Sequence, residues 1–162
     1  MYEIGNDMNA TVEGIACWQR IDARLTTSGA LTEANLALLS TLGIDHVINL
    51  ALADSPGILL DEEERLAARG IAYTHIPVPF NAPDAAHLAR FCAVMDASDQ
   101  QAVHVHCVRN WRVSAFLYRW HRERRGMPER EARALLQQQW EPETNDHEDA
   151  RTWARFIAGD AN

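Results

Sequence analysis

The sequence predicts an α/β protein, a three-layer sandwich in which helices flank a central, mainly parallel sheet. Two observations carry this prediction. Short apolar, β-branched segments alternate along the chain with longer segments of helical periodicity. After the last strand-like segment, Gln101 to His106, only helical patterns follow. Strands that alternate with helices are typical of parallel sheets covered on both faces.

Each expected strand is a short run of apolar or β-branched residues bounded by loop-forming residues. Pro79 closes the run Ile71–Val78, and the tetrapeptide Thr26–Gly29 is typical of a turn. The predicted strands are one or two short ones within residues 14–25, then His46–Leu50, Ile71–Val78 and Gln101–His106.

The expected helices show apolar residues at helical spacing together with the usual end signals. Gly43 and Gly70 stand where the first two helices should stop, because glycine adopts the left-handed backbone that ends many helices. The predicted helices are Thr32–Gly43, Leu60–Arg69, Pro83–Ala97, Arg112–Arg125, Pro128–Trp140 and Asp146–Ile157.

Length, composition and charge narrow the class of protein. The chain has 162 residues, of which 47% are hydrophobic, and shows no linker or repeat, so we expect a single domain over residues 1–162. The net charge of −8 argues against a nucleic-acid partner, because such proteins need a basic face. All 15 basic residues are arginine, which excludes Schiff-base chemistry through lysine.

Targeting and redox signals predict a cytoplasmic protein. Met1 to Val12 is polar and lacks the basic and apolar regions of a signal peptide, and no apolar run is long enough for a membrane span. The three cysteines, Cys17, Cys92 and Cys107, have neither a disulfide pattern nor a zinc spacing. We therefore expect reduced thiols and neither a metal nor another cofactor.

The segment from Val103 to Ser114 carries the strongest functional signal. A buried strand delivers Cys107 into a short loop, and Arg112 follows where a helix opens. Free backbone N–H groups and the helix dipole favour negative charge there, so the thiolate is stabilised and phosphate or sulfate can bind. Ligands of open α/β sheets also bind beyond the carboxyl ends of strands. The pattern indicates phosphoryl transfer through cysteine.

The segment resembles the signature loop of the cysteine-dependent protein tyrosine phosphatases, in particular the small dual-specificity type. Their motif is His-Cys, five residues, then Arg followed by Ser or Thr. Neighbouring segments resemble a bacterial branch of that family: Ile21–Gly29, Val47–Leu50, Tyr73–Val78 and Arg112–Phe116. The resemblance implies the sandwich fold and metal-free hydrolysis of a phosphate monoester through a phosphocysteine intermediate.

The loop departs from that motif in length. Only four residues separate Cys107 from Arg112, and Val113 intervenes before Ser114. The loop lacks the usual glycine, and Asn110 is the residue that best tolerates a left-handed backbone in its place. A shorter loop offers one N–H group fewer to phosphate. The bacterial branch has the same short form, so we expect a functional loop.

Chemistry assigns roles to these residues. Cys107 is expected to attack phosphorus, and Arg112 to clamp two phosphate oxygens with its planar guanidinium; the alternatives are an inert buried thiol and a solvated arginine. His106, by resemblance, steadies the loop and tunes the thiolate. Ser114 either stabilises the leaving thiolate or bonds the local backbone. The residues expected to bind phosphate are Val108, Arg109, Asn110, Trp111 and Arg112.

Two of these residues have an open alternative. Arg109 either attracts phosphate at the mouth of the site or projects into solvent. Trp111 either shapes the rim or packs against the protein. A separate alternative is that His104 and His106 bind zinc as a His-x-His pair, although no third and fourth ligand follow at a convincing spacing.

The resemblance also implies an aspartate general acid on the loop after the preceding strand. Asp84 is the acidic residue of the 79–84 loop. The alternative is a capping role, with Asn81 as the N-cap of the next helix and Asp84 at its third position. Asp54 is a second candidate, and a chain without an acid would turn over quickly only esters with good leaving groups.

Two other functional classes share a cysteine in an anion-binding loop. A rhodanese-like sulfurtransferase would form a persulfide, and a non-catalytic module would bind phosphorylated partners without turnover. The neighbouring motifs favour the phosphatase. Its substrate would be a phosphorylated protein or a small phosphate ester.

Overall fold

The computed structural model describes residues 14–159. Its centre is a five-stranded sheet in the order β1-β2-β5-β3-β4, in which only β1 runs antiparallel to its neighbour. The strands are β1 (Gln19–Arg20), β2 (Leu25–Ser28), β3 (His46–Asn49), β4 (Ala72–His75) and β5 (Val103–His106). The predicted mainly parallel sheet is therefore confirmed.

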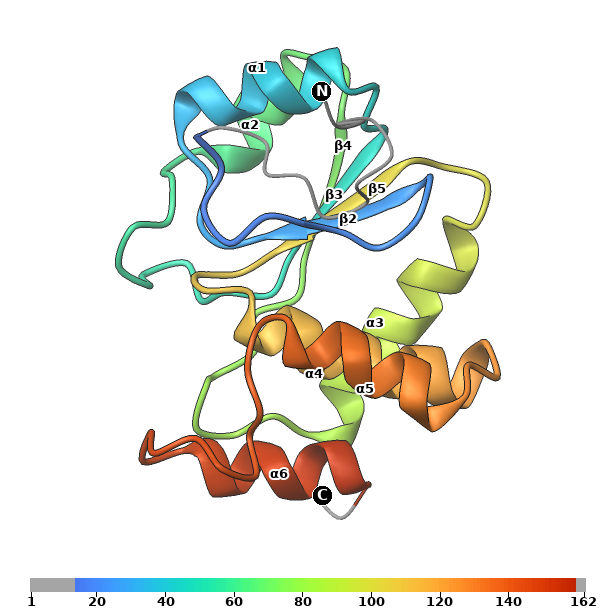
Figure 1. Cartoon of the computed structure of the whole chain (residues 1–162). Helices are drawn as coiled ribbons and strands as arrows, with labels where there is room; N and C mark the ends of the chain where they lie inside the picture. The colour runs from blue at the N-terminus through green and yellow to red at the C-terminus, as the bar shows by residue number, and fades with distance from the viewer. Residues whose placement is uncertain (1–13, 160–162) are drawn as a thin grey trace, which may run out of the picture.

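Helices cover both faces of this sheet, so the predicted three-layer sandwich is confirmed. Figure 1 shows α1 and α2 on one side of the sheet and the four later helices on the other. The helices are α1 (Glu33–Thr41), α2 (Glu62–Ala67), α3 (Ala85–Ala97), α4 (Trp111–Arg124), α5 (Glu129–Gln137) and α6 (Ala150–Ala158).

Two hydrophobic cores hold the layers together, one on each face. Leu36 and Leu39 of α1 pack with Leu66 of α2 and Val47 of β3. The larger core fills the other face, with Phe91, Phe116, Trp153 and Phe156 among its members. Alternate side chains of a strand point to opposite faces, so adjacent residues of β3 join different cores: Val47 one and Ile48 the other.

The prediction of a turn at Thr26–Gly29 is wrong. Leu25–Ser28 forms strand β2, which pairs in parallel with the central strand β5. Its hydroxyl side chains are buried and hydrogen-bonded. The Thr26 and Ser28 hydroxyls lie 2.8 Å from the two ring nitrogens of His104. Tertiary partners thus satisfy polar groups that local sequence rules assign to a loop.

The central position of β5 determines where the site lies. Because β3, β4 and β5 are parallel, the loops that follow them meet at one edge of the sheet. Within the described residues, no helix is long and apolar enough to cross a membrane. The segment from Met1 to Val12, for which we expect no signal peptide, lies outside the described residues.

Candidate active site

The loop between β5 and α4 turns sharply after Cys107. Asn110 has a left-handed backbone, with φ of 69°, and α4 begins at the next residue, Trp111. This confirms the expectation that asparagine takes the place of glycine in the shortened loop. In the described structure, the backbone N–H groups from Val108 to Arg112 make no hydrogen bond to the protein. They form a set of unused donors in the loop that follows Cys107.

The loop is held from behind by the segment that follows β2. The N–H of Ala30 donates to the carbonyl of Val108 at 3.0 Å. A Cβ atom on Gly29 would lie 2.4 Å from that same oxygen, so this close approach requires glycine. The Asn110 amide donates to the Cys17 carbonyl at 2.9 Å and to the Thr27 hydroxyl at 2.8 Å. Asn110 therefore fixes the shape of the loop from its buried side.

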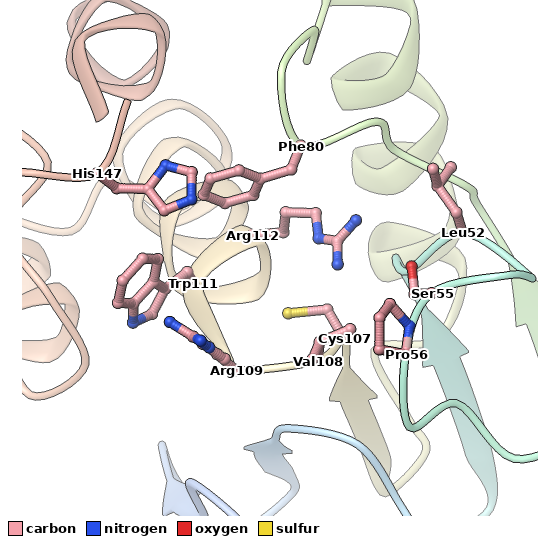
Figure 2. Close-up of a pocket in the computed structure, with 10 residues that line it drawn as sticks. All are labelled: Leu52, Ser55, Pro56, Phe80, Cys107, Val108, Arg109, Trp111, Arg112 and His147. Carbon is pink, nitrogen blue, oxygen red and sulfur yellow. The ribbon is translucent and has the colours of Figure 1, made fainter. Parts of the chain in front are cut away.

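A pocket of about 290 Å³ opens in front of the loop. Figure 2 shows the sulfur of Cys107 and the guanidinium of Arg112 on its inner surface. The loops after β3, β4 and β5 and a segment before α6 contribute its lining, which consists of Leu52, Ser55, Pro56, Phe80, Cys107, Val108, Arg109, Trp111, Arg112 and His147. No carboxylate belongs to this lining as far as residues 14–159 are concerned.

Arg112 is a buried cation without an anionic partner. Its residue is 6% exposed, and one guanidinium nitrogen donates to the carbonyl of Val78 at 2.8 Å. None of the ion pairs in the described region includes it. A buried charge without a counter-ion is costly. Arg112 also lies at the N-terminal end of α4, where the helix dipole disfavours a cation. An anion bound in the pocket would remove both penalties.

Trp111 and Arg109 form one side of the pocket. The Trp111 ring stacks on Trp140, with centroids 4.4 Å apart and planes 4° apart. The guanidinium of Arg109 lies 5.4 Å from the centroid of the Trp111 ring, on an exposed side chain. Trp111 thus both packs and shapes the rim. Arg109 lines the mouth and remains open to solvent.

His106 is held by a residue that the sequence did not single out. Its Nε2 lies 2.5 Å from Oε2 of Glu62, and both side chains are buried, at 0% and 3% exposure. Its Nδ1 lies 3.2 Å from the carbonyl oxygen of Cys107 and can only donate to it. The ring and Glu62 therefore share a proton behind the nucleophile. Three adjacent glutamates begin α2, and no sequence pattern distinguishes Glu62 from the others.

His104 and Ser114, two further polar residues near the loop, have hydrogen-bond partners within the protein. Both ring nitrogens of His104 are hydrogen-bonded to hydroxyl groups, and burial holds the pKa of His104 well below its usual value, so the ring is neutral. The Ser114 hydroxyl donates to the carbonyl of Trp111 at 3.1 Å, and Ser114 does not line the pocket. Stabilisation of the leaving thiolate by Ser114 stays a prediction.

Asp84 lies outside the pocket lining and caps α3. Its carboxylate accepts the N–H of His87 at 2.9 Å, and its side chain is 43% exposed. The expectation of Asn81 as N-cap is wrong: Asp84 is itself the N-cap, and the His87 ring accepts its N–H in return. Asp54 is exposed and also outside the lining.

Sequence reasoning missed half of the pocket lining: Leu52, Ser55 and Pro56 after β3, Phe80 after β4, and His147. Phe80 follows β4, and the rule that ligands lie beyond strand ends could have indicated it. His147 lies in an irregular segment between α5 and α6, far along the chain from Cys107. Only the packing of the helical tail brings it to the site, with ring centroids 5.0 Å from Phe80 and 6.1 Å from Trp111.

A thiol at the end of a central parallel strand, a cradle of free N–H groups and a buried arginine at the start of the next helix define the cysteine-dependent phosphatase class. The family model described as a DSP-PTPase phosphatase fused to NAD+ kinase matches residues 7–154. The chain belongs to this family, and it is a cysteine-dependent phosphatase of the dual-specificity type. No match was found among curated proteins.

Solved structures with this fold are similar over almost the whole chain. A DUF442 candidate phosphatase from Shewanella putrefaciens CN-32 is 26% identical, with a TM-score of 0.79, covering 100% of this chain and 98% of that one. P. aeruginosa TpbA is 18% identical, with a TM-score of 0.71 and coverage of 96% and 92%. PTPMT1 in complex with PI(5)P is 13% identical, with a TM-score of 0.68 and coverage of 88% and 97%. The last two support the fold alone.

Proposed function

We propose that the chain hydrolyses phosphate monoesters in two steps through a phosphocysteine on Cys107. The thiolate forms the S–P bond as the ester P–O bond breaks, and the leaving oxygen takes a proton. Water then attacks phosphorus, and inorganic phosphate and the thiolate are released. Splitting the displacement in this way replaces one difficult step by two easier ones.

The observation that carries this proposal is the unpaired, buried guanidinium of Arg112 beside Cys107. Together with the N–H groups of Val108, Arg109, Asn110 and Trp111, it provides donors for the oxygens of one phosphoryl group. A planar fork binds two oxygens at once, as phosphoryl transfer requires. The hydrogen bond between His106 and Glu62 holds the His106 ring, which in turn bonds the Cys107 carbonyl at the start of the loop.

The proposed substrate is a phosphorylated protein or a small phosphate ester. The pocket is mostly apolar, with the aromatic rings of Phe80 and Trp111 at its side, which suits an ester whose alcohol is aromatic or apolar. P. aeruginosa TpbA has been crystallised with pTyr and PTPMT1 with PI(5)P, so this fold accommodates both kinds of ester. We further propose a bacterial, cytoplasmic enzyme, consistent with three free cysteines.

The general acid expected at Asp84 stays a prediction. Its carboxylate would have to leave the α3 cap to reach a leaving group in the pocket. Asp84→Asn tests the role, because asparagine is also a good N-cap. An acid role predicts a lost limb of the pH–rate profile and a selective loss on alkyl phosphates. A purely structural role predicts unchanged rates on every substrate.

A substrate panel tests the proposed function. The wild-type chain and Cys107→Ser are compared on an aryl phosphate, phosphotyrosine and phosphothreonine peptides and phosphoinositides. We expect turnover by the wild type and none by the variant. Phosphate binding without turnover would instead indicate a non-catalytic module, and cyanide-dependent release of thiocyanate from thiosulfate would indicate a sulfurtransferase.

A further inference from the structure

His147 is a pocket residue to which the proposed reaction assigns no role. It comes from the irregular segment that leads into α6, and it lines the pocket with Cys107 and Arg112. The ring meets Phe80 edge-on, with planes 78° apart, and Trp111 in the same way, with planes 86° apart. Its backbone N–H donates to Oδ1 of Asn145 at 2.8 Å. These contacts fix the ring at the pocket wall.

Hydrogen bonding determines which ring nitrogen of His147 carries a proton. The backbone N–H of Asp149 donates to Nδ1 at 3.0 Å, so Nδ1 must be unprotonated. The neutral ring then carries its hydrogen on Nε2. In Figure 2 this second nitrogen lies on the side of the ring toward Phe80 and, beyond it, Arg112. His147 therefore offers one N–H donor, Nε2–H, to the pocket. The lone pair on Nδ1 already accepts the N–H of Asp149.

The pocket needs such a donor for the oxygen that departs. Negative charge builds on the ester oxygen as the P–O bond breaks. The lining contributed by residues 14–159 includes no carboxylic acid, and the carboxylate of Asp84 accepts the N–H of His87 in the first turn of α3. A fixed neutral imidazole can stabilise such a charge through its N–H, because a preorganised donor needs no reorientation during the reaction.

We propose that His147 is a catalytic residue that donates a hydrogen bond from Nε2 to the leaving-group oxygen in the first step. The inference rests on the proposed phosphatase function. The electron pair of the breaking P–O bond passes to the oxygen, which the Nε2–H stabilises. The oxygen then takes a proton from water, and the imidazole stays neutral throughout. His147 thus assists most where the leaving group is a poor one.

The test is the dependence of kcat/KM on the leaving group, measured over aryl and alkyl phosphates for the wild type and His147→Phe. Phenylalanine keeps an aromatic ring against Phe80 and Trp111 and removes the donor. We expect a loss of about 10- to 100-fold on alkyl phosphates and a small one on activated aryl phosphates. His147→Gln retains an N–H donor and should recover part of the loss.

Controls separate this role from a structural one. His46→Phe changes a histidine at the opposite end of the sheet, where its ring nitrogens meet Ser98 and Thr74, and should leave the dependence on leaving group unchanged. An equal loss on all esters, or none, with His147→Phe would overturn the proposal. So would selective loss with Asp84→Asn alone, which would return the role to the aspartate.

The proposal has a second readout that needs no turnover. Long-range ¹⁵N NMR of the ring distinguishes the two tautomers, and we expect a protonated Nε2 and an unprotonated Nδ1. The reverse tautomer would overturn the proposal. A wild-type chain that hydrolyses no ester would refute the proposed function and this role together, whereas an active wild type with an unchanged His147→Phe profile refutes only the role of His147.

Discussion

The buried pair of Glu62 and His106 should contribute strongly to stability. Replacing Glu62 by alanine leaves the His106 ring, at 0% exposure, without its partner at 2.5 Å. Removing one partner of a buried, hydrogen-bonded pair costs about 3–5 kcal/mol, because the other group stays buried without a partner. For a domain of this size, each kcal/mol lowers Tm by about 2–4 °C. Glu62→Ala should therefore melt about 6–20 °C below the wild type.

Glu62→Gln separates the charge from the hydrogen bonds. The amide can donate to Nε2 of a neutral His106, and Nδ1–H still donates to the Cys107 carbonyl. Only the charge-assisted part of the bond is lost, so we expect a cost of about 1–2 kcal/mol. Glu63→Ala is the matched control, since Glu63 is the exposed neighbour and should change stability by less than about 0.5 kcal/mol.

Urea unfolding followed by tryptophan fluorescence measures all three variants, because the chain contains five tryptophans. We expect the order wild type, Glu62→Gln, Glu62→Ala in falling stability. The reasoning is refuted if Glu62→Ala lies within 1 kcal/mol of the wild type, or if glutamine is as damaging as alanine.

The remaining predictions concern the guanidinium of Arg112, the thiol of Cys107 and the pH dependence of stability. Arg112→Lys should lose most activity although the charge is kept, whereas Arg109→Lys should be mild; steady-state kinetics giving the opposite order would contradict the site geometry. Iodoacetamide should label Cys107 before the other two cysteines at pH 6.5, because burial raises the pKa of the Cys17 thiol and raises that of Cys92 to about 11. Mass spectrometry should also find that phosphate protects Cys107 from labelling. Burial lowers the pKa of His121 to about 4. The unfolded chain therefore binds a proton on this ring at a higher pH than the folded one, so the free energy of unfolding is highest above about pH 6.5 and falls as the pH drops towards 4. Unfolding at pH 7 and pH 5 should show part of this loss, about 2 kcal/mol of the about 3 kcal/mol reached at full protonation, and His121→Gln should reduce the difference.

Periodicity predicted most of the fold because helices and strands bury their apolar faces at different spacings. The pattern of Val47 and Ile48 predicts β3, and the glycine at 43 predicts the end of the first helix; both are confirmed. β2 was missed because its threonines and serine suit a turn when only local sequence is considered. Their burial depends on pairing with β5 and on the ring of His104, far along the chain.

The active site likewise combines residues that the local sequence predicts with residues that only tertiary packing places there. By itself the sequence determined the nucleophile loop: Cys107 follows a strand and Arg112 opens a helix within a few residues, and short-range backbone geometry dictates both positions. Asn110 in the left-handed region is equally local. Only the tertiary structure decided which distant side chains complete the site. Glu62 and His147 reach the loop through the packing of α2 and of the segment before α6, and Asp84 turns to the end of its own helix. Those choices depend on long-range burial and on competition for hydrogen-bond partners, which no local pattern records.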